Sequence, residues 1–185
     1  MTNINSIISK DHNGKKQRGT TLIEFLLYLA IAAAIVGGAI MLYSTVKSSN
    51  QSSQMIKDVV SVQAGVSSLY IGQSNYDGLT NEVLYNAKKL PSSLKYDNGT
   101  LITAEGGTLE VEGDGLTYTM TITDVSSASC ISMVSTLSTG FIGVSVDGTE
   151  LASSASDFPI STADAASACG ADQNVTIIYT GSSGS

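Results

Sequence analysis

The N-terminal part of the chain contains two hydrophobic patterns that follow one another without a break. From Leu22 to Tyr43 nearly every position is apolar, and about 20 such residues at 1.5 Å each span the hydrocarbon core of a bilayer. Apolar residues then recur at intervals of three and four with polar residues between them, which is typical of an amphipathic helix. With no proline before Pro91, the pattern predicts one helix from about Thr20 to Ile71.

The two halves of this helix differ in how their apolar residues are distributed around the helix axis. Residues 20–44 are apolar all round and fit a membrane span or the core of a larger assembly. Residues 45–71 are apolar on one side only, so we expect Val59, Val62, Val66 and Leu69 to pack against the domain that follows. A cleaved secretory signal fits poorly, because its apolar region would be shorter and would end in a small-residue cleavage site.

Beyond residue 71 the periods are short and turn residues are frequent. Alternation is clean in the segment Leu116 to Thr123, and Gly113-Asp114-Gly115 before it suits a tight hairpin. We therefore predict an α+β fold in which residues 72–185 form a globular head with a mostly antiparallel sheet across the amphipathic half of the helix. The predicted strands are 100–104, 108–112, 116–124, 141–146 and 174–180; the predicted helices are 80–89, 126–137 and 162–169. The Ser/Gly tail from Gly181 is expected to be frayed.

The net charge of −7 conceals two parts of opposite sign. Four of the nine basic residues lie in the first 18 positions, and after Gly19 there are 5 lysines against 15 acidic residues. An acidic head argues against nucleic-acid binding. A basic cluster directly before an apolar span predicts a cytoplasmic N-terminus and an exported head. The cluster consists of Lys10, Lys15, Lys16 and Arg18.

Few residues suggest chemistry. The one histidine, His12, lies before the apolar segment, so the rest of the chain has no Ser-His-Asp or Cys-His set and no histidine-based metal site. We expect no enzyme, no cofactor and no metal. The acidic group Glu105, Glu110, Glu112 and Asp114 could bind Ca²⁺, but a solvated strand face and hairpin tip is the favoured interpretation.

The two cysteines, Cys130 and Cys169, form no C-x-x-C motif, which argues against a zinc ribbon or a thioredoxin-like site. In an exported head they would form one disulfide; the alternative is two unrelated buried thiols. The disulfide would close a loop of about 40 residues and contribute roughly 4 kcal/mol in the chain-entropy model.

Glu24 is the feature that the two patterns do not explain. A lone carboxylate in hydrocarbon costs on the order of a few kcal/mol, and less near the interface. One interpretation is that it is tolerated at headgroup depth. The other is that a cut after Gly19 creates a cationic amine at Thr20, and that Glu24 neutralises this amine on a neighbouring copy.

The segment from Lys15 to Glu24, followed by the apolar run, resembles the processing site of type IV prepilins. The resemblance implies a leader of residues 1–19, cleavage between Gly19 and Thr20 by a membrane prepilin peptidase, and N-methylation of Thr20 by the same enzyme. It also implies that Glu24 neutralises the N-terminus of an adjacent subunit during assembly.

The long leader and the absence of phenylalanine at Thr20 are similar to the type IVb branch, although Thr20 departs from the residues usual there. The segment Ser67 to Leu79 resembles the corresponding part of pilins from bundle-forming pili, whose disulfide-bounded region is also matched by Cys130 and Cys169. The resemblance implies a type IV pilin fold and a major structural subunit. Such a subunit starts in the inner membrane with its head in the periplasm. It is then polymerised by the pilus assembly machinery with other copies into an extracellular filament for adhesion, aggregation or bundling.

Other classes of protein have the same kind of N-terminal sequence. A minor pilin, a conjugative thin-pilus pilin and a type II secretion pseudopilin are alternatives. A monomeric membrane-tethered binding domain is an alternative of another class, and it predicts an uncut leader.

Overall fold

The computed structural model describes residues 21–137, 140–170 and 174–182. The chain divides between Leu42 and Tyr43 into two compact units. Helix α1 (Leu22–Leu69) has 48 residues, close to the bounds that the hydrophobic pattern predicts.

In the first unit, the large apolar side chains of α1 are exposed. Leu22 and Ile23 are more than three-quarters exposed, and even Ile31 is 49% exposed. The helix is apolar and long enough to cross a membrane, by length and composition. A helix that is apolar all round is normally buried in protein or lipid. Within one copy of the chain, the described residues do not cover this segment.

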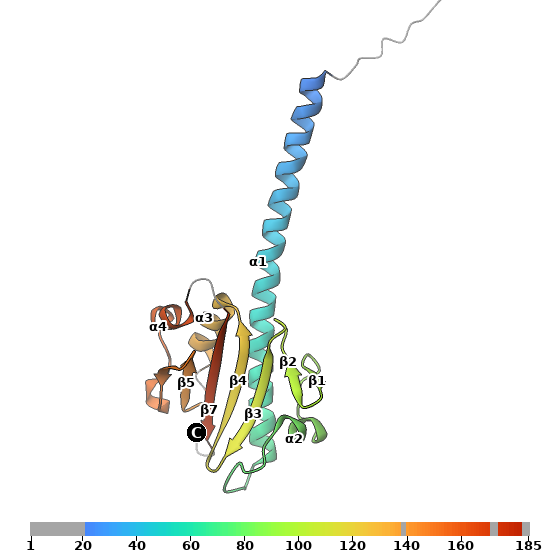
Figure 1. Ribbon diagram of the computed structural model, residues 1–185. Coiled ribbons are helices and arrows are strands. Elements are labelled where there is room, and N and C mark those ends of the chain that lie inside the picture. Colours follow the sequence, from blue (N-terminus) through green and yellow to red (C-terminus); the bar gives the residue numbers. More distant parts are fainter. Residues whose placement is uncertain (1–20, 138–139, 171–173, 183–185) are drawn as a thin grey trace, which may run out of the picture. The chain divides into compact units, whose positions relative to one another are not determined.

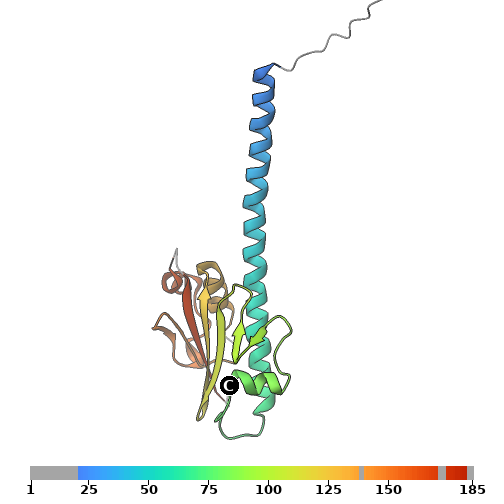
Figure 2. The ribbon, with the colours of Figure 1, turned by 45° about the vertical axis from the view of Figure 1, so that its right-hand side comes forward.

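The second unit is built on one seven-stranded sheet of order β1-β2-β3-β4-β7-β5-β6. Every neighbouring pair is antiparallel, and the part of α1 that belongs to this unit, residues 43–69, runs along one face of the sheet (Figures 1 and 2). The α+β class is confirmed. The strands are β1 (Lys95–Asp97), β2 (Thr100–Ile102), β3 (Thr108–Asp114), β4 (Thr117–Val125), β5 (Gly143–Val146), β6 (Thr149–Ala152) and β7 (Val175–Ser182).

One hydrophobic core joins α1 to this sheet. From Thr117 to Thr123 strand β4 alternates between half-buried and buried residues, which places Tyr118, Met120 and Ile122 on the inner face. The same core contains four residues of α1, as the helical period predicted except that Leu69 is only partly buried. These four residues are Met55, Val59, Val62 and Val66.

Two residues of α1 differ from the simple amphipathic pattern. Val60 is 45% exposed, because its place in the helical turn points away from the sheet. Asp58 is only 3% exposed, although it reads as a polar gap residue. Its Oδ1 accepts hydrogen bonds from the side chains of Gln54 and Ser93, which compensate part of the cost of burying a polar group.

The short helices begin at side chains that cap them. Helices α2 (Asn81–Asn86), α3 (Ser127–Thr136) and α4 (Thr162–Cys169) follow Thr80, Ser126 and Ser161, whose hydroxyls each accept a backbone N–H of the first turn. A 3₁₀ turn, η1 (Ala155–Asp157), follows β6. Helix α2 is shorter than the predicted 80–89, because Lys88 takes a positive φ of 56° that a helix does not allow.

Three features of the sheet escape the sequence pattern. Strands β1 and β6 have only three and four residues, too few to show a period. The expectation of a frayed tail from Gly181 is wrong at its start, because Gly181 and Ser182 pair with Tyr118 and Thr117 of β4. A Cβ at position 181 would overlap the Tyr118 ring, so glycine there serves close packing.

Candidate functional site

The exposed apolar part of α1 carries one carboxylate, Glu24, in the first turn of the helix. The backbone N–H of Glu24 donates to the carbonyl of Thr21 at 2.9 Å, which begins the helix. A negative charge in a first turn is favourable next to the helix dipole. The arrangement presents an acceptor for a cation at the very start of an apolar surface.

The other residues of the predicted processing signature lie outside the described residues: Lys15, Lys16, Arg18, Gly19 and Thr20. Their roles, and the pairing role of Glu24, stay predictions from the sequence. What the structure does supply is the helix beginning directly after them, with Glu24 exposed.

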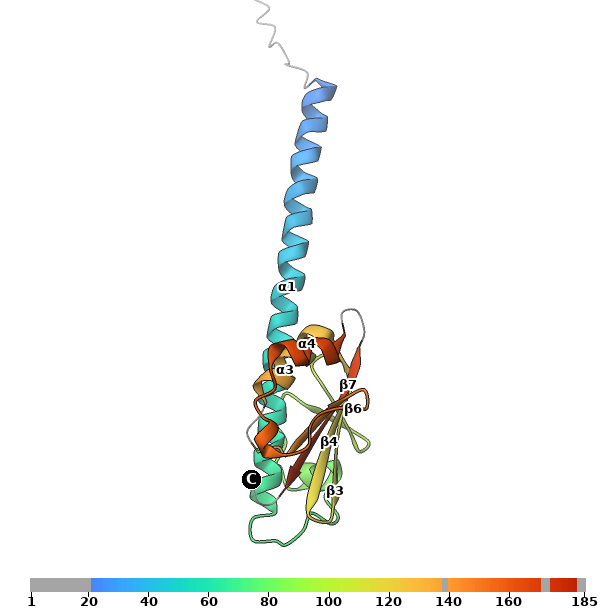
Figure 3. The same ribbon diagram turned by 90° about the vertical axis from the view of Figure 1, so that its left-hand side faces the viewer.

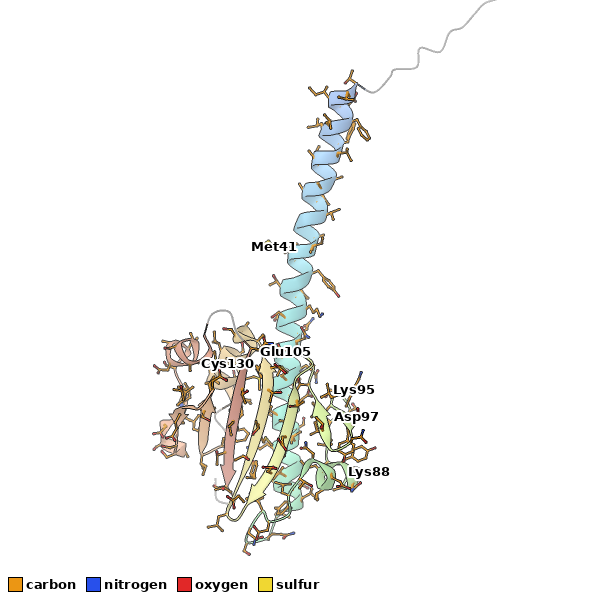
Figure 4. All side chains as sticks on the ribbon, viewed as in Figure 1. Met41, Lys88, Lys95, Asp97, Glu105 and Cys130 are labelled. Carbon is orange, nitrogen blue, oxygen red and sulfur yellow. A yellow bond between two sulfur atoms is a disulfide. The ribbon has the colours of Figure 1, made fainter. Side chains whose placement is uncertain are left out.

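The two cysteines meet in the second unit. Cys130 of α3 and Cys169 of α4 form a disulfide with Cα atoms 5.8 Å apart, and both side chains are fully buried. The chain between them contains β5, β6, η1 and α4. The predicted disulfide is therefore present. It links α3 to α4, the helix that follows the β5–β6 edge of the sheet. Figure 4 labels Cys130.

The four acidic residues considered for Ca²⁺, for which the sequence favours a solvated strand face, are not brought together as one site. Glu105 accepts hydrogen bonds from the backbone N–H and hydroxyl of Ser126 and from the hydroxyl of Ser129. It thereby caps the N-terminus of α3. Glu110 and Glu112 are exposed along β3, and Asp114 is exposed at its end. The described residues contain no group of three or more His, Cys, Asp or Glu that could hold a metal ion.

The Glu105 cap also reaches the long helix. The hydroxyls of Ser129 and Ser52 lie 2.5 Å apart, and both residues are buried. Three segments distant in sequence thus share one polar network: α1, the β2–β3 loop and α3. Ser126 is a residue type that commonly begins a helix, but nothing in the sequence indicates that Glu105, 21 positions earlier, is its hydrogen-bond partner.

Asn81 is a second structural residue that the sequence does not reveal. It is 5% exposed. Its amide donates to the carbonyls of Gly99 and Leu109, and its oxygen accepts from the N–H of Val111, each at 3.0 Å. One side chain therefore satisfies backbone groups of β3 and of the β1–β2 turn, and fixes α2 against the sheet.

Two tyrosines of the core, Tyr118 and Tyr179, are fully buried. Burial raises the pKa of Tyr118 and of Tyr179 well above the usual value for tyrosine. Hydrogen bonds from Ser153 and Ser154 lower the pKa of the exposed Asp157. None of these shifts brings a group near neutral pH, where a general acid or base works best.

Known proteins resemble this chain over most of its length. The family model described as PilS N terminal matches residues 49–182. The major structural subunit of bundle-forming pilus from Escherichia coli O127:H6 (strain E2348/69 / EPEC) is 33% identical over 180 residues, covering 88% of this chain and 93% of the relative. The corresponding subunit from Escherichia coli O111:H- is 31% identical with the same coverage. A crystal structure of a type IV b pilin from Salmonella typhi aligns with a TM-score of 0.50 and 19% identity, covering 64% of this chain and 92% of that one.

Proposed function

Because the chain belongs to the PilS family of type IV pilins, we propose that it is the major structural subunit of a type IVb pilus. The observation that carries the proposal is the apolar surface of Leu22–Leu42, which is exposed over its whole length and is part of the same chain as a disulfide-closed head. A surface of that size in water is unstable. Lipid covers it before assembly, and other copies cover it in the filament.

Processing prepares the N-terminus for that exchange. A prepilin peptidase in the inner membrane cuts between Gly19 and Thr20 and methylates the new amine of Thr20. The basic residues of the leader hold the N-terminus in the cytoplasm, so that the head folds in the periplasm and its disulfide forms there. The inner-membrane assembly machinery then moves the subunit into an extracellular fibre.

Glu24 selects the register of the incoming subunit. Unpaired in the membrane, its carboxylate is unfavourable by up to about 3 kcal/mol at the bilayer centre, and by less near the interface. In the filament it neutralises the amine of Thr20 on an adjacent copy, which removes that penalty only when the stalks are aligned. Lipid contacts and contacts with other apolar helices are about equally favourable for the stalk. The removal of the penalty on Glu24 therefore favours the assembled state over the membrane-bound monomer.

The proposal is tested by shearing the cells and measuring the intact mass and N-terminal sequence of the released material. We expect large fibres whose subunits begin at methylated Thr20. Absence of fibres, together with a membrane protein that still begins at Met1, would instead support a monomeric tethered domain. Low abundance in the fibres would indicate a minor pilin.

The Glu24→Gln variant tests the register role. It keeps the shape of the side chain and removes its charge, so we expect it to be cut and to form its disulfide, but to be missing from sheared fibres. Tyr28→Phe, one turn further along the same apolar segment, is the matched control and is expected to give normal fibres. A normal fibre yield from Glu24→Gln would rule out the proposed role of the carboxylate.

A further inference from the structure

Positive charge in the head is confined to one part of the chain. All five lysines after Gly19 lie at or before position 95, and three of them fall within eight residues: Lys88, Lys89 and Lys95. Residues 96–185 contain 11 Asp and Glu and no Lys or Arg. Such separation gives the head a local cationic surface against an acidic background.

Two of these lysines, Lys88 and Lys95, line a groove of about 630 Å³ at the β1 edge of the sheet, whereas the side chain of Lys89 donates a hydrogen bond to the hydroxyl of Ser68. The groove also contains the apolar residues Leu90 and Ile102. Tyr85 and Tyr96 stack beside it with ring centroids 4.0 Å apart, and Tyr85 is 51% exposed. Lys88, Lys95 and Asp97 all line the groove, and Figure 4 shows the three side chains at the same edge of the sheet. We call this surface the basic groove.

A second groove, of about 490 Å³, lies at the β6 edge and is lined by β6, η1 and α4. Its rim carries Glu150, Asp157 and Asp164, all exposed, above apolar residues such as Ile160. We call this surface the acidic groove. Because β1 and β6 are the two ends of the strand order, the grooves lie at opposite edges of one sheet. Figure 1 labels β1 at the first edge, and Figure 3 shows β6 and α4 at the other.

We propose that the basic groove of one copy binds the acidic groove of the next copy. Two different surfaces at opposite edges form a head-to-tail contact, which repeats without closing and so generates an open helical filament. The charges are complementary, and each groove also contains apolar residues, Leu90 and Ile102 in the basic groove and Leu151 and Ile160 in the acidic groove, so the contact would combine charge pairing with apolar burial as protein interfaces do. We take the partner to be a second copy of this chain, because the same head carries an acidic groove whose charge is complementary to that of the lysines. This inference rests on the proposed function and adds the lateral contact between heads.

A simpler role for these charges is to protect edge strands. A lysine or a glutamate on a short edge strand prevents unwanted strand addition, and either sign serves equally well. Reversal of sign therefore separates the two roles: it leaves edge protection intact and destroys complementarity. Lys88, Lys95 and Glu150 are exposed, so their substitution leaves the core unchanged.

The test uses the full chain in cells and measures sheared-fibre yield. Lys88→Glu with Lys95→Glu, and separately Glu150→Lys with Asp164→Lys, are each expected to lower the yield about tenfold, since like charges face each other in the contact. Combining all four substitutions restores complementarity with the signs exchanged, and is expected to recover most of the wild-type yield. Glu110→Lys with Glu112→Lys, which changes the same charge on β3, is the matched control and is expected to be neutral. Disulfide formation on a non-reducing gel checks folding of every variant.

The outcomes separate this inference from the proposed function. Wild-type yield from the reversed variants, an equal loss in the β3 control, or no recovery in the fourfold variant would each overturn the lateral contact, while fibres from wild-type cells would still support a pilin. A crosslinking measurement is independent of yield. Lys88 lines the basic groove and Ser167 the acidic groove. A chain with both Lys88→Cys and Ser167→Cys, treated in fibres with a short thiol crosslinker, is expected to give a ladder of multimers, and each single variant is expected to give no dimer. A dimer from a single variant would show a symmetric contact and overturn the proposal.

Discussion

Removal of the Cys130–Cys169 disulfide offers the sharpest test of how the head is stabilised. The two cysteines are 39 positions apart, and in the chain-entropy model a loop of this length contributes roughly 4 kcal/mol to the free energy of unfolding. The crosslink joins α3 to α4 around the β5–β6 edge. For a domain of this size each kcal/mol corresponds to about 2–4 °C, so we expect the midpoint of unfolding to fall by roughly 8–16 °C.

The choice of replacement matters because both side chains are fully buried. Serine would place two hydroxyls in the core, each costing about 1–3 kcal/mol if it finds no partner, and would exaggerate the effect. Alanine at both positions removes the crosslink with a smaller additional loss of packing. The Cys130→Ala, Cys169→Ala variant is therefore the one to compare with the wild-type protein.

The assay is thermal unfolding of the full-length protein in mild detergent, followed by near-ultraviolet circular dichroism. The chain has eight tyrosines and no tryptophan, and among the tyrosines only Tyr28 and Tyr43 belong to the apolar pattern, so the signal reports on the head. Reductant is expected to lower the wild-type midpoint nearly to that of the alanine variant, and to leave the variant unchanged. Equal midpoints for oxidised and reduced wild-type protein would refute a stabilising crosslink.

Three further substitutions probe the sheet, each measured by urea unfolding. Asn81→Ala leaves the buried N–H of Val111 and the carbonyl of Leu109 without their partner, and is expected to cost about 3 kcal/mol. Gly181→Ala places a methyl group against the Tyr118 ring and is expected to cost about 1–3 kcal/mol through overpacking. Tyr179→Phe removes a buried hydroxyl for which the described residues offer no hydrogen bond, so it is expected to be neutral or stabilising at pH 7. Because burial raises the pKa of Tyr179, the wild-type protein loses stability above the unfolded pKa of about 10 and the phenylalanine variant loses less; equal losses would contradict this.

Local periodicity explains which elements could be predicted. The long helix is specified by apolar spacing alone, and β4 by the alternation of polar and apolar residues from Thr117 to Thr123. The starts of α3 and α4 follow from capping serines that precede short helical patterns. Each of these signals is contained within one element, so no knowledge of distant partners is needed.

Residues whose partners are distant in sequence could not be predicted. Asn81 bonds to groups 18, 28 and 30 positions away, and Glu105 caps a helix 21 positions further on. Gly181 reads as part of a flexible tail, but the ring of Tyr118 requires it. In each case the sequence shows only a common polar residue or a glycine, and the structural role of that residue depends on partners that the fold brings next to it.

On our proposals, two features of the chain gain a partner beside a second copy. The first is the apolar surface of Leu22–Leu42 with its carboxylate at Glu24; the second is the cluster of lysines on an acidic head. Natural sequences depart from the rules for a stable soluble domain mainly at functional sites. On our proposals a neighbouring subunit supplies the missing partner in both places, an amine for Glu24 and an acidic groove for Lys88 and Lys95. In the proposed filament the two contacts differ in depth, because the first would be buried among the apolar helices and the second would lie between exposed surfaces of the heads. Salt screens exposed charges beyond a Debye length of about 8 Å at physiological ionic strength, so high salt is expected to weaken the contact between heads before it affects the register set by Glu24.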